Sequence, residues 1–147
     1  MAVKDLLNEK LREAMRSHDE DAKRVYRMIL SSVKFAEKTN GRELQDNEIV
    51  QILQKELKIR KETLAEAEKG GRIAVADEAM KDITAIEALL PKQLTEEELK
   101  AIVADVIKEV DAKSAADMGK VMKAVMPKVN GLAANAMVSK TVKELLS

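Results

Sequence analysis

Between Ser114 and Gly131 the chain places apolar residues at the spacing of one face of an α-helix. The residues on that face stand at i, i+3, i+4, i+7 and i+8, and they are Met118, Val121, Met122, Val125 and Met126. Ser114 is a candidate N-cap, and Pro127 predicts that the helix ends at or just before Met126. Because apolar residues at this spacing are usually buried, we expect an amphipathic helix with Met122 in a core.

The same spacing recurs along the chain and predicts an all-α fold. Helix-favouring residues dominate, aromatic residues make up 1% of the sequence, and only two prolines and five glycines interrupt it. No run shows the alternation of a convincing β-strand. The predicted helices cover residues 3–16, 18–39, 45–69, 72–90, 96–110, 114–126 and 134–146, and a capping box with Ser17 at the N-cap and Glu20 at N3 is expected to open the second.

A domain boundary is predicted near Pro91, which stops the fourth helix. Thr95 with Glu98 forms a capping box directly after it, and this pattern starts a new helix. We therefore expect two helical bundles, a four-helix N-terminal domain over residues 1–90 and a three-helix C-terminal domain over residues 91–147.

The charge of the chain is balanced overall and uneven locally. The formal net charge is +0, which argues against strong non-specific binding of nucleic acid. Residues 93–117 hold seven acidic side chains against three lysines, whereas residues 118–147 hold five lysines against Glu144 alone. The final segment is thus a basic element in a neutral protein. No membrane span and no leader are recognised, so a cytoplasmic location is the expectation.

Gly119 is unexpected within the sixth predicted helix, where glycine costs about 1 kcal/mol relative to alanine. The glycine suggests close approach by another backbone, either a neighbouring helix or a ligand such as a phosphate chain. Lys120 and Lys123 project from the face opposite the methionines. They fit either a solvated surface or a phosphate-binding surface.

Several strings, taken in order, resemble one family. They are Arg60-Lys61-Glu62-Thr63, Gly70-Gly71-Arg72, Leu90-Pro91-Lys92-Gln93-Leu94-Thr95, and Asp117-Met118-Gly119-Lys120-Val121-Met122 followed by Lys128 and Gly131. In this order the chain resembles the YqeY family over essentially its full length. It is also similar to the C-terminal tail region of GatB, a subunit of the glutamine-dependent aminoacyl-tRNA amidotransferase.

The resemblance implies a fold of two helical bundles and a tail domain that contacts tRNA. Carried over position by position, it implies a surface for RNA, and with the neighbouring lysines the expected RNA-binding residues are Gly119, Lys120, Lys123, Lys128 and Gly131. Leu132 and Ala134 stand where the family commonly has polar or basic residues, so binding is expected to be weak. The family label also implies a carbon–nitrogen ligase that uses glutamine as amido donor.

The residues themselves point to no enzyme site. The chain has no cysteine and a single histidine, His18, which is expected in a turn between helices. Neither a metal-ligand cluster nor a phosphate loop is recognised, so no catalytic residue and no cofactor is predicted. A second basic cluster is expected to form a solvated, ion-paired face, with a phosphate-contacting face as the alternative, and consists of Arg24, Arg27, Lys55, Lys58, Arg60 and Lys61.

Three functions therefore stay open at the level of sequence. The first is a free-standing module that binds tRNA through backbone and shape, since two aromatic residues cannot build a stacking platform. The second is an adaptor that binds a protein partner in an apolar groove between the bundles. The weakest is a free-standing amidotransferase. The oligomeric state is not predicted.

Overall fold

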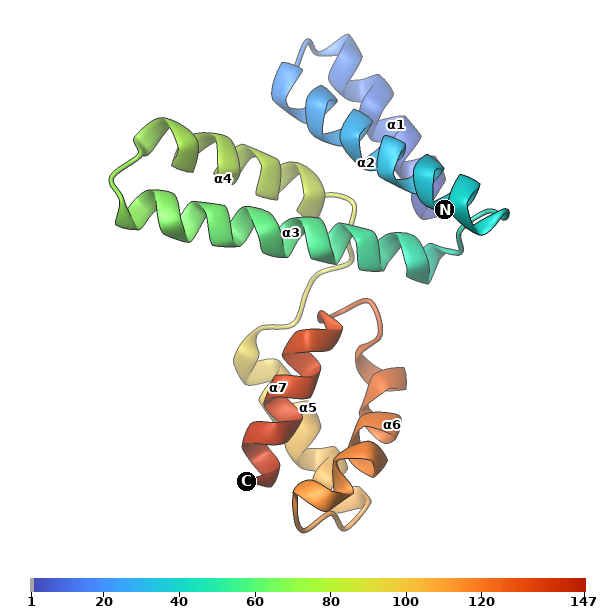
Figure 1. The fold of residues 1–147 in the computed structure, drawn as a ribbon, viewed down its shortest axis with the longest axis vertical. Coiled ribbons are helices and arrows are strands. Elements are labelled where there is room, and N and C mark those ends of the chain that lie inside the picture. Colours follow the sequence, from blue (N-terminus) through green and yellow to red (C-terminus); the bar gives the residue numbers. More distant parts are fainter. Residues whose placement is uncertain (1) are drawn as a thin grey trace. The chain divides into compact units, whose positions relative to one another are not determined.

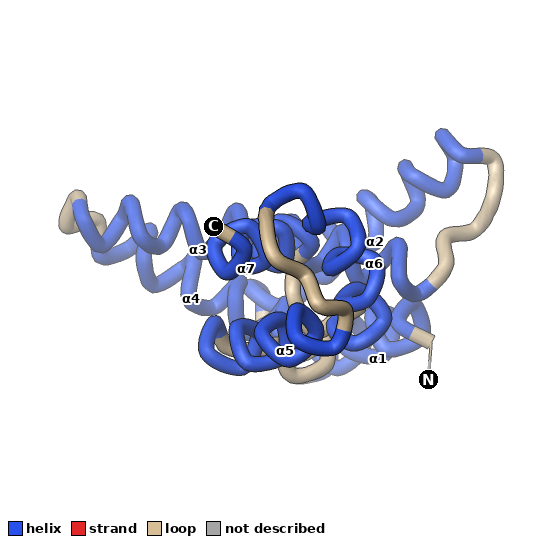
Figure 2. Tube along the Cα trace, turned by 90° about the horizontal axis from the view of Figure 1, so that it is seen from below, coloured by secondary structure: helices blue, strands red, loops and turns tan. Residues whose placement is uncertain are grey.

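The computed structural model describes residues 2–147, and all regular structure within that range is helical (Figures 1 and 2). The predicted all-α class is therefore confirmed. The helices are α1 (Val3–Arg16), α2 (Glu20–Asn40), α3 (Asp46–Lys69), α4 (Ile73–Glu87), α5 (Glu96–Glu109), a short 3-10 turn η1 (Ala115–Asp117), α6 (Met118–Val129) and α7 (Asn135–Leu146).

The chain divides into two compact units, Met1–Pro91 and Lys92–Ser147. Unit 1 holds α1 to α4, and unit 2 holds α5 to α7. Each unit encloses its own cluster of buried apolar side chains. Closed cores of this kind are what lets a short helical segment form a stable structure.

Unit 1 is built from two helical hairpins, α1 with α2 and α3 with α4 (Figure 1). Its fully buried large side chains are Leu7, Val25, Ile29, Val33, Ile49, Leu53 and Ile86. A buried carboxylate, Asp82 on α4, joins three helices, because its Oδ1 accepts a hydrogen bond from Arg24 of α2 at 2.7 Å. Its Oδ2 lies 3.7 Å from Nε of Arg60 on α3. Arg60 in turn pairs with Glu56 one turn earlier on α3.

Unit 2 is a three-helix bundle whose core is rich in valine. Its fully buried side chains are Leu99, Val103, Val106, Val121, Val125, Val129, Val138 and Val142. The predicted capping box opens α5, since the Thr95 hydroxyl accepts from the backbone N–H of Glu98 and the Glu98 carboxylate accepts from the N–H of Thr95. This reciprocal cap fixes the start of unit 2 close after the boundary proline.

The cap at the start of α2 lies two residues later than the sequence predicts. Asp19, not Ser17, accepts from the N–H of Ala22 at 3.1 Å, and Ser17 instead closes the C-terminus of α1. His18 between them adopts a left-handed backbone with φ 56°. Ser17 and His18 form the turn that reverses the chain between α1 and α2, so the next polar residue, Asp19, becomes the N-cap of α2.

Helix α6 differs from expectation in its start, its end and its buried face. The Ser114 side chain makes no capping hydrogen bond, so the predicted N-cap is wrong, and the helix begins only at Met118, after the 3-10 turn η1. It continues through Pro127 to Val129, so the predicted stop before the proline is wrong. Val129 is fully buried. The free energy gained by burying this side chain offsets the loss of the one backbone hydrogen bond that proline removes, so the helix continues for one further turn. The buried stripe is formed by Val121, Val125 and Val129, whereas Met122 is only partly buried at its flank.

Helix α4 leaves part of its apolar side uncovered. Ile73 and Met80, which the sequence pattern assigns to a buried face, are 75% and 52% exposed. The positions that α4 does bury include Ala79, Ile83 and Ile86. The helix therefore has an inner apolar stripe in the core and a second apolar stripe outside it.

The loop between α2 and α3 holds a charge pair that should make unit 1 sensitive to acid. Arg42 donates to both carboxylate oxygens of Glu48, at 2.8 and 2.9 Å, and the N–H of Gln45 donates to the same carboxylate. The Arg42 hydrogen bond first, and the Gln45 backbone bond second, lower the pKa of Glu48 to about 2. An acid whose pKa is lowered by folding stabilises the folded state above its unfolded pKa, and this stabilisation is lost as the pH falls.

We expect the melting temperature of the chain to fall between about pH 4.5 and about pH 2. Glu48→Gln should flatten this decline, because it removes the group that binds a proton more readily when unfolded. Circular dichroism melts of both proteins across that range measure the difference. Parallel declines would show that Glu48 does not couple folding to protons, and Glu62→Gln, at an exposed position of α3, is the matched control.

Candidate nucleic-acid interface on helix α6

The structure places three of the five predicted RNA-binding residues together on the outer side of α6. Gly119, Lys120 and Lys123 are all exposed and lie within one turn of each other. They face away from the stripe of Val121 and Val125, which is fully buried. The amphipathic pattern therefore fixes the direction of both lysines, because burial of the valines turns the opposite side of the helix outward.

The surroundings of Gly119 exclude one of the two explanations for its presence. A Cβ built on this residue would meet no atom within 4 Å outside its immediate helical surroundings. Among the described residues of unit 2, no neighbouring helix therefore requires the glycine. The backbone of this turn instead lies open beside two lysines, and an outside group could approach it closely.

The other two predicted residues lie elsewhere and have contacts within unit 2. Nζ of Lys128 lies 3.3 Å from a carboxylate oxygen of Glu109 on α5. Gly131 adopts a left-handed backbone with φ 81°, and its carbonyl accepts a hydrogen bond from the Gln93 side chain at 2.9 Å. The next carbonyl, that of Leu132, accepts from the N–H of Leu94 at 2.8 Å. The left-handed conformation of Gly131 therefore shapes the α6–α7 loop, and the two hydrogen bonds hold this loop against the segment before α5.

Asp117 holds the chain that leads into α6. Its carboxylate accepts a hydrogen bond from the N–H of Lys113 at 2.8 Å. This bond is the main cause of a lowered pKa for Asp117, and a further bond from the backbone of Ser114 and the nearby charge of Lys120 act in the same direction. The carboxylate thus stays ionised and orders the turn directly before the lysine-bearing surface.

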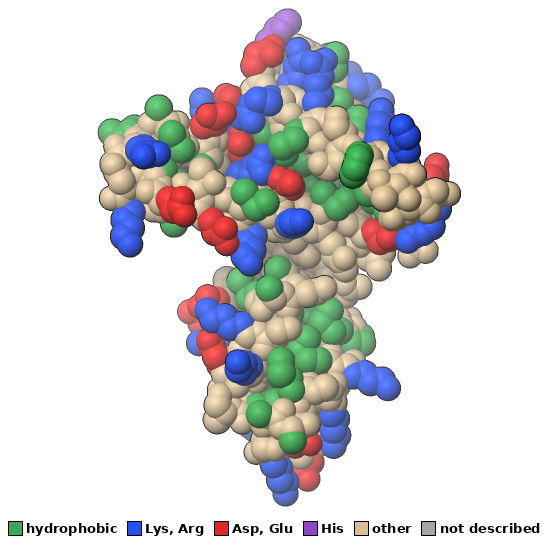
Figure 3. Space-filling model, in the orientation of Figure 1, with side chains coloured by type: hydrophobic (Ala, Val, Ile, Leu, Met, Phe, Trp, Pro, Cys, Tyr) green, Lys and Arg blue, Asp and Glu red, His purple; other side chains and the backbone are tan. Residues whose placement is uncertain are grey.

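Some members of the second basic cluster, in unit 1, form ion pairs within that unit. Arg24 and Arg60 both contact the buried carboxylate of Asp82. Lys58 and Lys61 on α3 are exposed. Figure 3 shows Lys and Arg side chains interspersed with Asp and Glu over the visible face of unit 1. This mixed surface agrees with the ion-paired reading of the cluster.

His18 is exposed in the α1–α2 turn. Residues 2–147 contain no group of three or more His, Cys, Asp or Glu side chains arranged to hold a metal ion. Over the same range, none of the helices combines the length and the apolar character needed to cross a bilayer.

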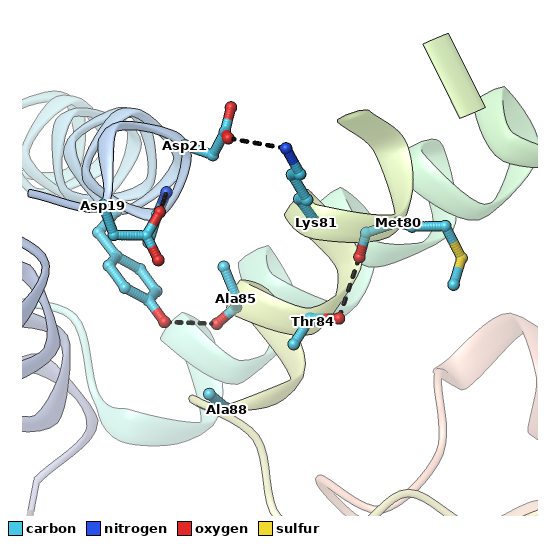
Figure 4. A pocket seen from close by; sticks show the side chains of 9 residues that line it. Asp19, Asp21, Met80, Lys81, Thr84, Ala85 and Ala88 are labelled. Atoms are coloured by element: carbon cyan, nitrogen blue, oxygen red, sulfur yellow. Dashed lines mark hydrogen bonds and ion pairs between the residues drawn. The ribbon is translucent and has the colours of Figure 1, made fainter. Parts of the chain in front are cut away.

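Sequence reasoning missed a cavity of about 520 Å³ in unit 1, between the N-terminal turn of α2 and the side of α4 (Figure 4). Tyr26 lies in its wall and donates its hydroxyl to the carbonyl of Ala85 at 2.9 Å. Asp21 on α2 and Lys81 on α4 approach to 3.5 Å across the rim. Nothing in the linear pattern joins these helices, because the residues that meet are about 60 positions apart.

The fold and this surface define a class of protein: a small all-helical chain of two bundles, whose second bundle exposes two lysines beside an open glycine. The family follows from comparison with known proteins. The model of the family described as Yqey-like protein matches residues 4–146, so the chain belongs to the YqeY family. An uncharacterized protein of Schizosaccharomyces pombe is 24% identical over 87 residues, which cover 59% of this chain and 71% of the yeast protein.

Proposed function

We propose that this chain is a free-standing module that binds tRNA through the outer side of α6, named here the α6 lysine surface and comprising Gly119, Lys120 and Lys123. The observation that carries the proposal is the exposed lysine pair beside a glycine with open space around it. Lysines bind phosphates as point charges, and a glycine lets a ligand come close to the helix backbone. The excess of lysine in residues 118–147 would draw a polyanion toward this segment of the chain.

Binding through so few charges should be weak and sensitive to salt. Each phosphate that a lysine contacts releases condensed counterions, so affinity falls as salt rises. A chain with a formal net charge of +0 gains no general attraction to RNA beyond this local surface. We therefore expect measurable binding of tRNA at low ionic strength and much weaker binding at about 0.15 M salt.

Charge reversal at the two lysines is the direct test. Lys120→Glu with Lys123→Glu should weaken tRNA binding at low salt by about tenfold or more and reduce the salt slope by about one per lost contact. Fluorescence anisotropy of labelled tRNA measures both quantities. The matched control is Lys58→Glu with Lys61→Glu, an exposed pair with the same spacing on α3.

The control pair separates a local surface from a general charge effect. Equal losses in the two double variants would show that only total charge matters, and unchanged binding in the α6 variant would remove this surface from consideration. Absence of any tRNA binding by the unaltered chain at low salt would reject the RNA proposal itself.

Gly119→Ala should separate stability from binding. Alanine has the higher helix propensity and its methyl group meets nothing within 4 Å, so the free energy of unfolding should rise by up to about 1 kcal/mol. If a phosphate approaches this backbone, the same methyl group should weaken tRNA binding by about tenfold, the value of one charge-assisted hydrogen bond. Urea denaturation and tRNA anisotropy measure the two effects, and a stabilised variant with unchanged affinity would show that no ligand uses the glycine.

A further inference from the structure

The outer stripe of α4 exposes two large apolar side chains of unit 1. Ile73 and Met80 are two turns apart on one side of the helix, with Asp77 between them. Ile73 is 75% exposed and Met80 52% exposed. Large apolar side chains that share one helix face and lie open to water mark a surface that another molecule covers. Ile73 and Met80 are in unit 1 and so do not belong to the α6 lysine surface, which is in unit 2.

The cavity between α2 and α4 borders the stripe. Met80 and Thr84 line its edge and continue the stripe at i+7 and i+11 from Ile73, and the Met80 side chain points away from α2 (Figure 4). Its apolar wall comes from Ala22 and the buried ring of Tyr26. A stripe of two to three helical turns that ends in a cavity matches the way a groove receives an amphipathic helix, with anchors at i, i+3 or i+4, and i+7.

The charges along this surface decide what kind of helix fits. The cavity rim carries Asp19 and Asp21, and Asp77 lies within the stripe. Two cations face Asp21. Lys81 pairs with it across 3.5 Å between two well-exposed side chains, and Arg24, one turn along α2, lies 3.9 Å from its other oxygen. An exposed pair of this kind contributes little free energy and can be displaced. The carboxylates therefore favour a basic ligand and repel a polyanion.

We propose that the outer stripe of α4, with Ile73, Asp77 and Met80, and the adjoining α2–α4 cavity together dock a basic amphipathic helix of a partner protein. An apolar side chain of that helix fills the cavity against Ala22 and Tyr26. A lysine or arginine beside it replaces Lys81 at Asp21. A second basic residue, two turns away, pairs with Asp77. This site is separate from the proposed RNA surface, so either can fail without the other.

The test is selection from a displayed library of helical peptides of about 18 residues, or five turns, against the whole 147-residue chain. The enriched peptides should carry apolar residues at i, i+3 or i+4, and i+7, with Lys or Arg beside them. Tyr26 is the only tyrosine and the chain has no tryptophan, so intrinsic fluorescence reports directly on the cavity. A selected peptide without tyrosine or tryptophan should change that signal on binding.

Three variants of the 147-residue chain decide the outcome. Ile73→Gln with Met80→Gln should weaken a selected peptide at least tenfold, and Asp77→Lys should weaken it while favouring a peptide whose basic residues are replaced by glutamate. Phe35→Gln is the matched control, since Phe35 is 73% exposed on α2 and does not line the cavity. Circular dichroism confirms that each variant is folded, as expected for exposed positions.

Several results would contradict the docking proposal. Enrichment of acidic peptides, equal losses in Phe35→Gln and the α4 variant, or no enrichment over an empty selection would overturn the proposal. Sedimentation equilibrium tests for a second copy of the chain, and a dimer that Ile73→Gln with Met80→Gln abolishes would assign the surface to self-association instead. Displacement of a bound peptide by tRNA would assign it to RNA.

Discussion

Asp82→Ala is expected to destabilise unit 1 by about 3 kcal/mol, which lowers its melting temperature by about 12–24 °C. The carboxylate is buried, and it accepts a hydrogen bond of 2.7 Å from Arg24. Its other oxygen lies 3.7 Å from Arg60, whose side chain is only 15% exposed. Removal of the carboxylate leaves the mostly buried guanidinium of Arg60 with one fewer counter-charge. The resulting loss in the free energy of unfolding is larger than the contribution of a surface ion pair.

The expected value is at the lower end of the range for buried pairs for two structural reasons. Arg24 is 44% exposed and can be hydrated once its partner is gone. Arg60 keeps its pair with Glu56. Asp82→Asn should have a smaller effect than Asp82→Ala, because the amide oxygen can still accept from Arg24 while the charge is removed.

Thermal and urea denaturation measure the change, with Asp77→Ala as the matched control on the same helix. Asp77 is exposed, so its removal should change stability by no more than about 0.5 kcal/mol. A double-mutant cycle with Arg24→Ala isolates the coupling energy of the pair. Equal stability of Asp82→Ala and Asp77→Ala would show that the buried ion cluster does not hold α2, α3 and α4 together.

Leu99→Ala is expected to unfold unit 2 while unit 1 stays folded. Leu99 is fully buried in the core of the smaller unit, and its truncation should cost about 2–5 kcal/mol. Unit 2 spans 56 residues, Lys92–Ser147, for which a total stability of about 3–8 kcal/mol is typical. The substitution therefore removes most of the stability of that unit.

The sequence offers a clean way to observe the two units separately. Tyr26 in unit 1 is the only tyrosine, so its fluorescence reports on unit 1 alone, whereas circular dichroism reports on the helices of both units. We expect Leu99→Ala to lose helical signal with an unchanged Tyr26 transition. Leu145→Ala, at a position 39% exposed on α7, should be much milder. A shifted Tyr26 transition in Leu99→Ala would show that the units fold as one, against the two-domain prediction.

Most of the secondary structure could be predicted because its signals are local. The capping box of Thr95 and Glu98 is present as the sequence indicates. Two other local features were placed wrongly, and the reasons are physical. Ser17 could cap a helix in isolation, but the reversal from α1 needs that residue, and Pro127 could end a helix in isolation, but burial of Val129 carries α6 past it.

The candidate site was predicted only in part. Periodicity places Lys120 and Lys123 on the outer side of α6, and the structure agrees. Whether Gly119 meets another helix was undecided by periodicity, because that depends on what lies beside α6. The role of Gly131 likewise depends on Gln93, 38 positions earlier, whose side chain donates to its carbonyl.

Propensity, apolar spacing and charge are properties of neighbouring residues, so they were enough to predict the all-α class, the approximate extent of the helices and the basic character of the last segment. Which flank of each helix is covered depends on packing between helices that are distant in sequence. This packing buried Val125 and left Met122 at the margin, it left Met80 exposed beside a cavity, and it brought Arg24 to Asp82 across 58 positions. A helical repeat defines a stripe, but the neighbours that pack against the helix set its width and direction, and no local pattern specifies those neighbours.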